Sequence, residues 1–399
     1  MRRALEAVAA TLLIGHVAAC NAYRPPPIRA GDFPFRLDSV RTQIVHPGVA
    51  RRFMYVASGP WAVHVLDVDR GHCWSAIAAK RPGSAAGRER TSATLRQLAD
   101  RGETVAGGVN ADFFVTTGPL AGLPVGMFAA DGRLIAGPVA QPVFAIDSAG
   151  VPHIGVFGDT GRATAGGGAY EVTGWNRDAS RGLALFDAMW GASTDTASSI
   201  VEVVLDASHP PRVLAVDTMA SGVAIPPGGA VLRTGRTAAS ELRTQLLSLR
   251  VGDTVATRTA VTPFHPRDAV GGRPVLVRDS QVVAGLDSVG QPGFATGRHP
   301  RTAVGIADGK RRLILAVVDG RQAPYSDGMT LRETADLMLA LGATDAINLD
   351  GGGSTALVYA DPDSAGVLRV ANRPSDPTGE RAVGNALGIV RCNRNQATR

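Results

Sequence analysis

The sequence has few of the residues that would build a metal centre or a carbohydrate-stacking surface. Its 399 residues include 3 cysteines and 8 histidines, and only 5% are aromatic. The cysteines lack the close spacing of a zinc site, and the histidines form no His-x-His pair. Sugar-binding proteins commonly stack aromatic rings on their ligands, so the low aromatic content argues against that class. We expect Trp74, Trp175 and Trp190 to belong to the core.

The chain also lacks a concentrated basic segment. The formal net charge is +6, but no run of five or six Lys or Arg residues occurs. This pattern argues against a nucleic-acid-binding arm. Arginine forks bind phosphate and carboxylate groups in a bidentate manner, so some arginines could instead serve an anionic substrate.

The N-terminus has the pattern of an export signal. Residues 1–20 place Arg2 and Arg3 before an apolar run that is too short to span a membrane. Small residues precede Cys20, as in a lipoprotein signal, which predicts a lipid-anchored protein of the periplasm or cell envelope. An ordinary secretory signal is the alternative. We expect a Pro-rich tether and lead-in over 21–54 and one folded domain over 55–395.

The other two cysteines lie near opposite ends of this domain. Disulfides persist outside the cytoplasm. A bond between Cys73 and Cys392 would tie the last strand to the first and stabilise the fold by roughly 4 kcal/mol. Two buried free thiols are the alternative.

The chain has the composition of a domain with many short strands. It contains 48 Gly and 25 Pro, which favour turns. Apolar alternation predicts strands over 62–69, 200–206 and 212–217, and a hairpin-like run over 251–261. Helices are predicted over 91–102 and from Thr330, where Glu333 completes a capping box, to Gly342. The predicted fold class is α+β or mixed α/β, a single domain of mixed sheets flanked by a few helices.

The most informative segment is INLDGGGSTALV, residues 347–358. A buried strand leads to Asn348 and Asp350, and Gly351, Gly352 and Gly353 follow. Glycine admits positive φ and close approach of a ligand at an entropic cost. Three glycines before the hydroxyls of Ser354 and Thr355 therefore indicate an active-site loop.

Further polar clusters interrupt apolar sequence elsewhere. Charged groups at the ends of buried strands are where catalytic residues are commonly held. Together the clusters predict one shared polar cleft. They hold Asn110 and Asp112; Arg298, His299 and Arg301; Asp319 and Arg321; and Asn372, Arg373, Glu380 and Arg381.

These motifs resemble the phosphodiester glycosidase family over residues 55–391. The likeness is carried by GVNADFF, HPRTAVGI, VVDGR, the helix with LDGGGST, and ANRP…ERAVGNALGIV. The resemblance implies hydrolysis of a sugar–phosphate diester at the sugar carbon, without a required cofactor. It implies a site drawn from Asn110, Arg301, Asp319, Arg321, Asn348, Asp350, Ser354, Asn372 and Arg381.

One departure from the family pattern bears on the substrate. Where the family usually has two glycines after the asparagine, this chain has Ala111 and Asp112. An added carboxylate would repel an anionic substrate unless it contacts a sugar hydroxyl or a cation. We expect Asp112 to be a substrate-binding residue.

Glycoside cleavage usually requires two carboxylates, but a phosphomonoester leaves with little protonation. We expect Asp350 to act as nucleophile or base, with Asp319 as its partner. Arg301 and Arg321 would bind the phosphate. The remaining substrate contacts would come from the asparagines and from the loops, with His299 either an acid or structural. The expected substrate-binding set is Asn110, Asp112, Asn348, Gly351, Gly352, Gly353, Ser354, Thr355, Asn372, Arg381 and His299.

Two other functions remain open from the sequence. Asp112, Asp319 and Asp350 could bind Ca²⁺ or Mg²⁺ in a phosphodiesterase that cuts the P–O bond. Alternatively, the chain could be a non-catalytic glycan-binding lipoprotein of the envelope. The expected partners are a glycan or sugar phosphate and, through a lipid anchor, a membrane. No nucleic acid is expected.

Overall fold

The computed structural model describes residues 23–27, 36–165, 167–179, 182–195, 200–218, 222–235 and 237–392. The predicted targeting segment 1–20, with Cys20, lies outside the described residues. Within the described ranges, no helix is both long and apolar enough to cross a membrane.

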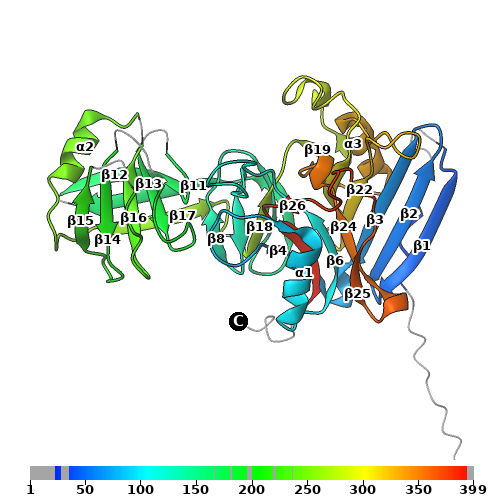
Figure 1. The fold of residues 1–399 in the computed structure, drawn as a ribbon, viewed down its shortest axis with the longest axis horizontal. Helices are drawn as coiled ribbons and strands as arrows, with labels where there is room; N and C mark the ends of the chain where they lie inside the picture. Colours follow the sequence, from blue (N-terminus) through cyan, green and yellow to red (C-terminus); the bar gives the residue numbers. More distant parts are fainter. Residues whose placement is uncertain are drawn as a thin grey trace, which may run out of the picture.

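The largest sheet has eight antiparallel strands (Figure 1). Its first strands fall within the predicted lead-in, so residues 39–54 are part of the fold and the predicted boundary at 55 is wrong. In spatial order the strands are β1 (Ser39–His46), β2 (Val49–Val56), β3 (Trp61–Asp69), β22 (Arg312–Val318), β21 (Arg301–Ala307), β23 (Asp345–Asn348), β19 (Val275–Arg278) and β20 (Gln281–Val282).

A five-stranded antiparallel sheet packs against it. Its central strand β6 is flanked by β24 and β27, and β4 forms one edge. A two-stranded pair lies beside it, formed by β5 (Glu89–Arg90) and β26 (Ala382–Val383). The five strands in order are β25 (Val367–Val370), β24 (Leu357–Asp361), β6 (Val105–Asn110), β27 (Ala386–Arg391) and β4 (Trp74–Ala79).

The two sheets and two helices form four layers. Alternate residues of β3 and β22 point to opposite faces, as strand geometry requires. Leu66 and Leu315 join the core between the two sheets. Val65 and Ile314 pack instead under helix α3 (Leu331–Ala340). Helix α1 (Thr91–Asp100) covers the outer face of the five-stranded sheet.

The remaining strands form two further sheets, one of which stands apart at the left end of Figure 1. That sheet has seven strands and packs helix α2 (Ser240–Leu247) against it. It contains β15 (Val213–Asp217), β14 (Glu202–Leu205), β16 (Ala230–Thr234), β13 (Leu183–Asp187), β12 (Gly168–Trp175), β11 (Gly158–Ala165) and β17 (Ala256–Thr262). The other, five-stranded, contains β10 (Pro152–Val156), β9 (Pro142–Ile146), β18 (Asp268–Gly271), β7 (Phe128–Ala130) and β8 (Arg133–Ala136).

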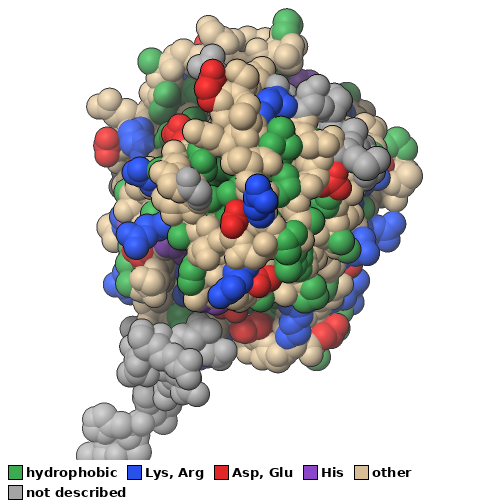
Figure 2. All heavy atoms as spheres, turned by 90° about the vertical axis from the view of Figure 1, so that its left-hand side faces the viewer, with side chains coloured by type: hydrophobic (Ala, Val, Ile, Leu, Met, Phe, Trp, Pro, Cys, Tyr) green, Lys and Arg blue, Asp and Glu red, His purple; other side chains and the backbone are tan. Residues whose placement is uncertain are grey.

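The outer face of the seven-stranded lobe carries no concentration of one residue type. Figure 2, which faces this end of the molecule, shows hydrophobic side chains scattered among acidic and basic ones. Leu214, Leu247 and Val251 are exposed there singly, which is normal for a protein surface.

The fold is richer in strand, and poorer in helix, than the predicted mixed α/β class. In the described part, α1, α2 and α3 are the α-helices, and β12 with β13 is the one parallel strand pair. The capping box of α3 is confirmed, because Thr330 Oγ1 accepts from Glu333 N and Glu333 Oε2 accepts from Thr330 N. The hairpin-like prediction for 251–261 is wrong, since this run supplies the single strand β17.

The two cysteines of the domain are neighbours with free thiols. Cys392 N donates to Cys73 O at 2.9 Å, so the ends of the domain meet as predicted. The disulfide considered from the sequence is not formed in this structure. Burial, together with the adjacent Cys73 thiol, raises the pKa of Cys392 to about 11. A thiol with so high a pKa is a weak nucleophile.

Candidate active site

The predicted site residues gather at one end of the two main sheets. Arg301 begins β21 and pairs with Val318, the last residue of β22, so Asp319 follows beside it. Asn348 ends β23 and pairs with Ala303. The antiparallel register thus brings three of the predicted polar clusters to the same end of these strands.

Asn110, the last residue of β6, and Asp350, just after β23, are linked by direct hydrogen bonds. Asn110 Nδ2 donates to Asp350 O at 2.7 Å, and Asp350 N donates to Ala111 O at 2.8 Å. Asn110 Oδ1 accepts from Thr302 Oγ1 and Ala356 N. The buried amide of Asn110 therefore holds Asp350 in place.

Asp350 is partly accessible to solvent but closely surrounded by protein. Burial raises the pKa of its carboxyl to about 6, although Ser354, the Gly351 N–H, Arg381 and Arg273 oppose the shift. The Gly351 N–H donates to Asp350 Oδ1 at 3.0 Å. A carboxyl with this pKa is poised between base and acid near neutral pH.

Each glycine of the triple-glycine loop has a separate steric reason. A Cβ on Gly351 would lie 2.6 Å from the Pro300 carbonyl oxygen. Gly352 has φ +61°, and a Cβ there would lie 3.3 Å from Arg321 Nη1. A Cβ on Gly353 would lie 2.3 Å from Arg381 Nη2. The glycines thus let two guanidinium groups approach the loop beside Asp350.

Arg301 is a buried cation whose bonds in the described residues are to carbonyl oxygens. Its Nε donates to Met329 O at 2.8 Å, and its Nη2 donates to Phe294 O at 2.6 Å. Burial and the neighbouring Arg321 lower its pKa to about 10. A guanidinium without a carboxylate partner leaves positive charge for an anionic ligand.

Arg321 and His299 lie next to Arg301. His299 Nε2 donates to Gly293 O at 3.0 Å, so its Nδ1 accepts from Arg321 Nη2 at 3.3 Å. Burial lowers the pKa of His299, and the two arginines lower it further. The His299 ring thus links Gly293 to Arg321. Arg321 itself has φ 59° and an exposed side chain.

Asp319 is the centre of a buried hydrogen-bond network. Its carboxylate accepts from His64 Nε2, Tyr325 OH, Asn372 Nδ2 and Arg373 N at 3.0–3.1 Å. Burial and this carboxylate raise the pKa of Tyr325. With 1% exposure, Asp319 has no free face toward a substrate. Its predicted role as the catalytic partner of Asp350 does not fit this geometry.

Asn372 and Thr355 are similarly committed to the fold. Asn372 Oδ1 accepts from Leu357 N, and its Nδ2 also reaches Thr355 O at 3.2 Å. Thr355 is 1% exposed. Both connect Asp319 to the glycine loop and hold its shape, so neither is placed to bind substrate as predicted.

Asp112 is buried away from the arginines of the loop. Its carboxyl accepts from Gly126 N at 3.0 Å and also faces the Gly271 N–H. Burial raises its pKa to about 8, against the opposing effect of Arg177. It is therefore mainly neutral at pH 7 and would not repel an anion. The carboxyl binds two peptide groups, Gly126 just before β7 and Gly271 at the end of β18.

The Asp112 carboxyl should make stability depend on pH. Since its folded pKa lies above the unfolded value, its stabilising effect is complete below about pH 4 and lost as pH rises through 8. We expect the free energy of unfolding to fall by roughly 3–5 kcal/mol more in wild type than in Asp112→Asn between pH 5 and 9. Urea unfolding of both proteins measures this, and equal falls would contradict it.

Two residues of the site were not predicted individually. Arg273 lies over the Phe113 ring and acts electrostatically on Asp350. Asn385 Oδ1 accepts from Asp112 N at 2.8 Å. Asn385 lies within the motif ERAVGNALGIV, but neither residue stands beside a long apolar run in the sequence.

Two buried amide atoms at the site have no hydrogen-bond partner among the described residues. They are Asn348 Oδ1 and Asn385 Nδ2, an acceptor and a donor. Leaving such a group unpaired costs about 1–3 kcal/mol.

The three aspartates do not form a cation site in the described part of the chain. No group of three His, Cys, Asp or Glu side chains there could hold a metal ion. Asp112 and Asp319 face separate sets of N–H and O–H donors, as described above, and only Asp350 borders the arginines.

Comparison with known families bears on the C-terminal half. Residues 211–390 match the model of the phosphodiester glycosidase family, which confirms the resemblance seen in the motifs. The match includes Arg301, Asp319, Asp350 and Arg381 and begins after Asn110. No curated protein matches this chain.

Solved structures share the fold. A hypothetical protein from Synechocystis has a TM-score of 0.72 and 22% identity, covering 88% of this chain and 64% of that one. This chain thus spans less than two thirds of that protein. A candidate exported protein from Burkholderia pseudomallei K96243 has a TM-score of 0.66 and 26% identity, covering 83% of this chain and 74% of that one. The catalytic domain of zebrafish N-acetylglucosamine-1-phosphodiester alpha-N-acetylglucosaminidase, auto-inhibited by its pro-peptide, is 17% identical with a TM-score of 0.43, covering 94% and 86%.

Proposed function

We propose that this chain hydrolyses a glycosyl phosphodiester at the sugar carbon, releasing a free sugar and a phosphomonoester. The observation that carries the proposal is the position of Asp350. Asp350 is a partly exposed residue whose carboxyl is closely surrounded by protein, and this burial raises its pKa to about 6. It is bordered by a loop that approaches Arg321 and Arg381 closely. The family match over residues 211–390 supports the same chemistry.

In this proposal Asp350 acts as nucleophile or base at the sugar carbon. Arg301 and Arg321 bind the phosphate and stabilise the charge that develops on it, with Arg381 beside the loop. The leaving phosphomonoester needs little protonation, because its second pKa is roughly 6. One carboxylate with a cationic clamp therefore suffices, and Asp319 acts only by positioning.

Asn348 Oδ1 and Asn385 Nδ2 are unpaired among the described residues but belong to residues that are 1% and 2% exposed, so they lie behind the surface that a sugar would contact. Ser354 is 2% exposed and bonds the Asp350 carboxyl, so it orients that group instead of contacting sugar.

The location follows from the N-terminal signal. We propose an exported protein anchored in the cell envelope through lipidated Cys20, with envelope glycans or exopolysaccharide as substrates. The name of the Burkholderia relative, a candidate exported protein, agrees with export.

The direct test is turnover of N-acetylglucosamine-1-phospho-methyl-mannoside by protein lacking residues 1–20. We expect release of free N-acetylglucosamine that persists in EDTA, with oxygen-18 from labelled water on the sugar. Label on the phosphate and loss of activity in EDTA would instead indicate a cation-dependent phosphodiesterase. Binding without turnover of this or polymeric substrates would indicate a glycan-binding protein.

A further inference from the structure

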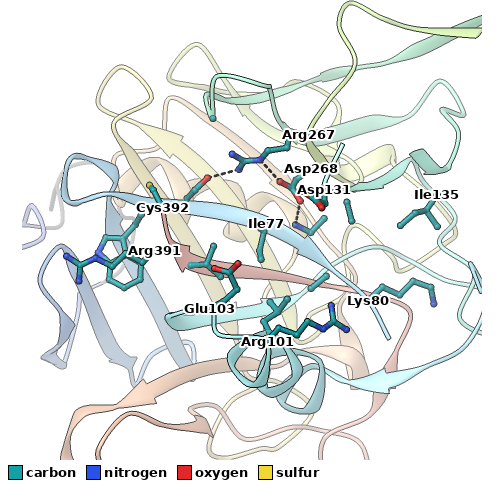
Figure 3. Close-up of a pocket in the computed structure, with 18 of the residues that line it drawn as sticks. Ile77, Lys80, Arg101, Glu103, Asp131, Ile135, Arg267, Asp268, Arg391 and Cys392 are labelled. Atoms are coloured by element: carbon teal, nitrogen blue, oxygen red, sulfur yellow. Dashed lines mark hydrogen bonds and ion pairs between the residues drawn. The ribbon is translucent and has the colours of Figure 1, made fainter. Parts of the chain in front are cut away.

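A cavity of about 620 Å³ lies outside the candidate active site. It follows β4, the edge strand of its sheet, where β4 meets β7 and β18. Figure 3 shows Arg267 and Asp268 on one side of this strand, and Arg101 and Glu103 on the other. None of the proposed catalytic or phosphate-binding residues lines it.

Positive charge predominates in the lining. Glu103, Asp131 and Asp268 are its acidic residues. Asp268 is already bound, accepting from Arg267 Nε at 2.8 Å and Ala78 N at 3.1 Å. The basic residues are Arg70, Lys80, Arg81, Arg101, Arg267 and Arg391.

Lys80 is a largely buried cation in this wall. Its Nζ donates to Ala86 O and Gly87 O, both at 3.0 Å, and makes no ion pair among the described residues. Burial and the neighbouring Arg81 lower its pKa to about 8. The Glu89 carboxylate opposes this shift without pairing directly with Lys80. An ammonium whose hydrogen bonds go to carbonyl groups is costly to bury, and an anion in the cavity would offset that cost.

Two arginines add charge that the described residues do not neutralise. Arg101 forms no ion pair with them, and Arg391 stacks on the Trp74 ring with its Cζ 5.8 Å from the centroid. Arginine forks bind phosphate oxygens in pairs, and Trp74, Ile77 and Ile135 provide apolar surface beside them. The cations would bind the phosphate of a sugar phosphate, and the apolar surface beside them would contact its sugar.

The cavity reaches toward the active site. Ala79, at one end of β4, pairs with Ala386 of β27, which in turn pairs with Asn110. Neighbouring strands lie about 4.8 Å apart, so this end of the cavity is roughly 10 Å from the strand end that holds Asp350.

We propose that this cavity is a second anion-binding site, which holds a neighbouring phosphate of a phosphodiester-linked glycan while the active site cleaves another. The part that concerns cleavage rests on the proposed function. The site would favour polymers over single phosphodiesters, because a polymer can occupy both places at once.

The test removes two cations without disturbing the wall. Lys80→Gln removes the charge and keeps two N–H donors for the carbonyl groups of Ala86 and Gly87, and Arg101→Gln shortens an exposed side chain. Arg96→Gln, on the exposed face of α1 and outside the cavity lining, is the matched control. Calorimetry in an Asp350→Asn background measures binding of inorganic phosphate and of a synthetic dimer of N-acetylglucosamine-1-phosphate units.

We expect the Lys80→Gln/Arg101→Gln pair to weaken dimer binding about tenfold or more, and Arg96→Gln to leave it unchanged. In the active protein, the same pair should raise KM for the dimer and not for a single phosphodiester. Weakened phosphate binding with unchanged dimer binding would mean a site for free phosphate and would overturn the proposal. Unchanged binding of both probes would overturn it as well.

These measurements separate the two proposals. If no variant or substrate shows turnover, the proposed hydrolase function fails. The calorimetry on Asp350→Asn still decides whether the cavity binds the dimer, because it does not depend on catalysis.

Discussion

Asp350→Asn should reduce kcat for a glycosyl phosphodiester by roughly 10³-fold or more, as removal of an essential catalytic carboxylate does in other hydrolases. The amide can neither attack the sugar carbon nor accept a proton. In the wild-type protein the Gly351 N–H donates to Asp350 Oδ1 at 3.0 Å. The oxygen of the asparagine amide can still accept this bond, so the loop should keep its shape. Sugar release by the purified variant measures the effect.

The control is Asp345→Asn, at the start of β23, the strand that leads to Asp350. Asp345 pairs with Arg278 at 3.2 Å in a partly exposed ion pair, so its loss should change kcat little. In wild type, kcat/KM should rise with pH through about 6, as the Asp350 carboxyl loses its proton. If Asp350→Asn kept a tenth of wild-type turnover, the assignment of Asp350 would be wrong.

The glycine loop shows how much of the candidate site a sequence motif could predict. Three consecutive glycines are costly, and sequence reasoning attributed them to close approach of a ligand. The structure shows that the close approach is by Pro300, Arg321 and Arg381, which lie far from the loop in sequence. The position of the site was therefore predictable, and the reason for each glycine was not.

Local signals predicted the elements that carry the site. The capping box fixes the start of α3, and Gly342 with φ +90° follows its last turn. Apolar alternation likewise found β3. By contrast, the seven-stranded lobe depends on pairings between residues as distant as Asp159 and Val261, which no local pattern encodes.

The individual roles of polar residues were the least predictable part. Asn110, Asp112, Asp319 and Asn372 have the residue types of a catalytic site, and the structure places all of them near it. Their hydrogen bonds nevertheless end on the protein itself. Sequence shows which groups are present, but partners from distant strands decide whether a group remains free for a substrate.

Asp319→Ala should lower the free energy of unfolding by about 3–5 kcal/mol, because it leaves several buried donors without an acceptor. His64, Tyr325, Asn372 and the Arg373 N–H all depend on this carboxylate. Denaturant unfolding measures the loss. Asp308→Ala, which removes a half-exposed partner of Arg312 beyond the other end of β22, should cost less than about 1 kcal/mol.

Asp319→Asn separates positioning from catalysis. The asparagine amide keeps one acceptor oxygen but loses the negative charge that raises the pKa of Tyr325. The ultraviolet titration of the Tyr325 phenol should therefore move to lower pH. A positioning residue should lose stability and activity together in Asp319→Ala and recover part of both in Asp319→Asn. Full stability in both variants, with turnover lost as completely as in Asp350→Asn, would instead make Asp319 the second catalytic carboxylate. The network of donors around Asp319 favours the first result, since four protein groups already donate to this buried carboxylate and leave no face of it open to a substrate.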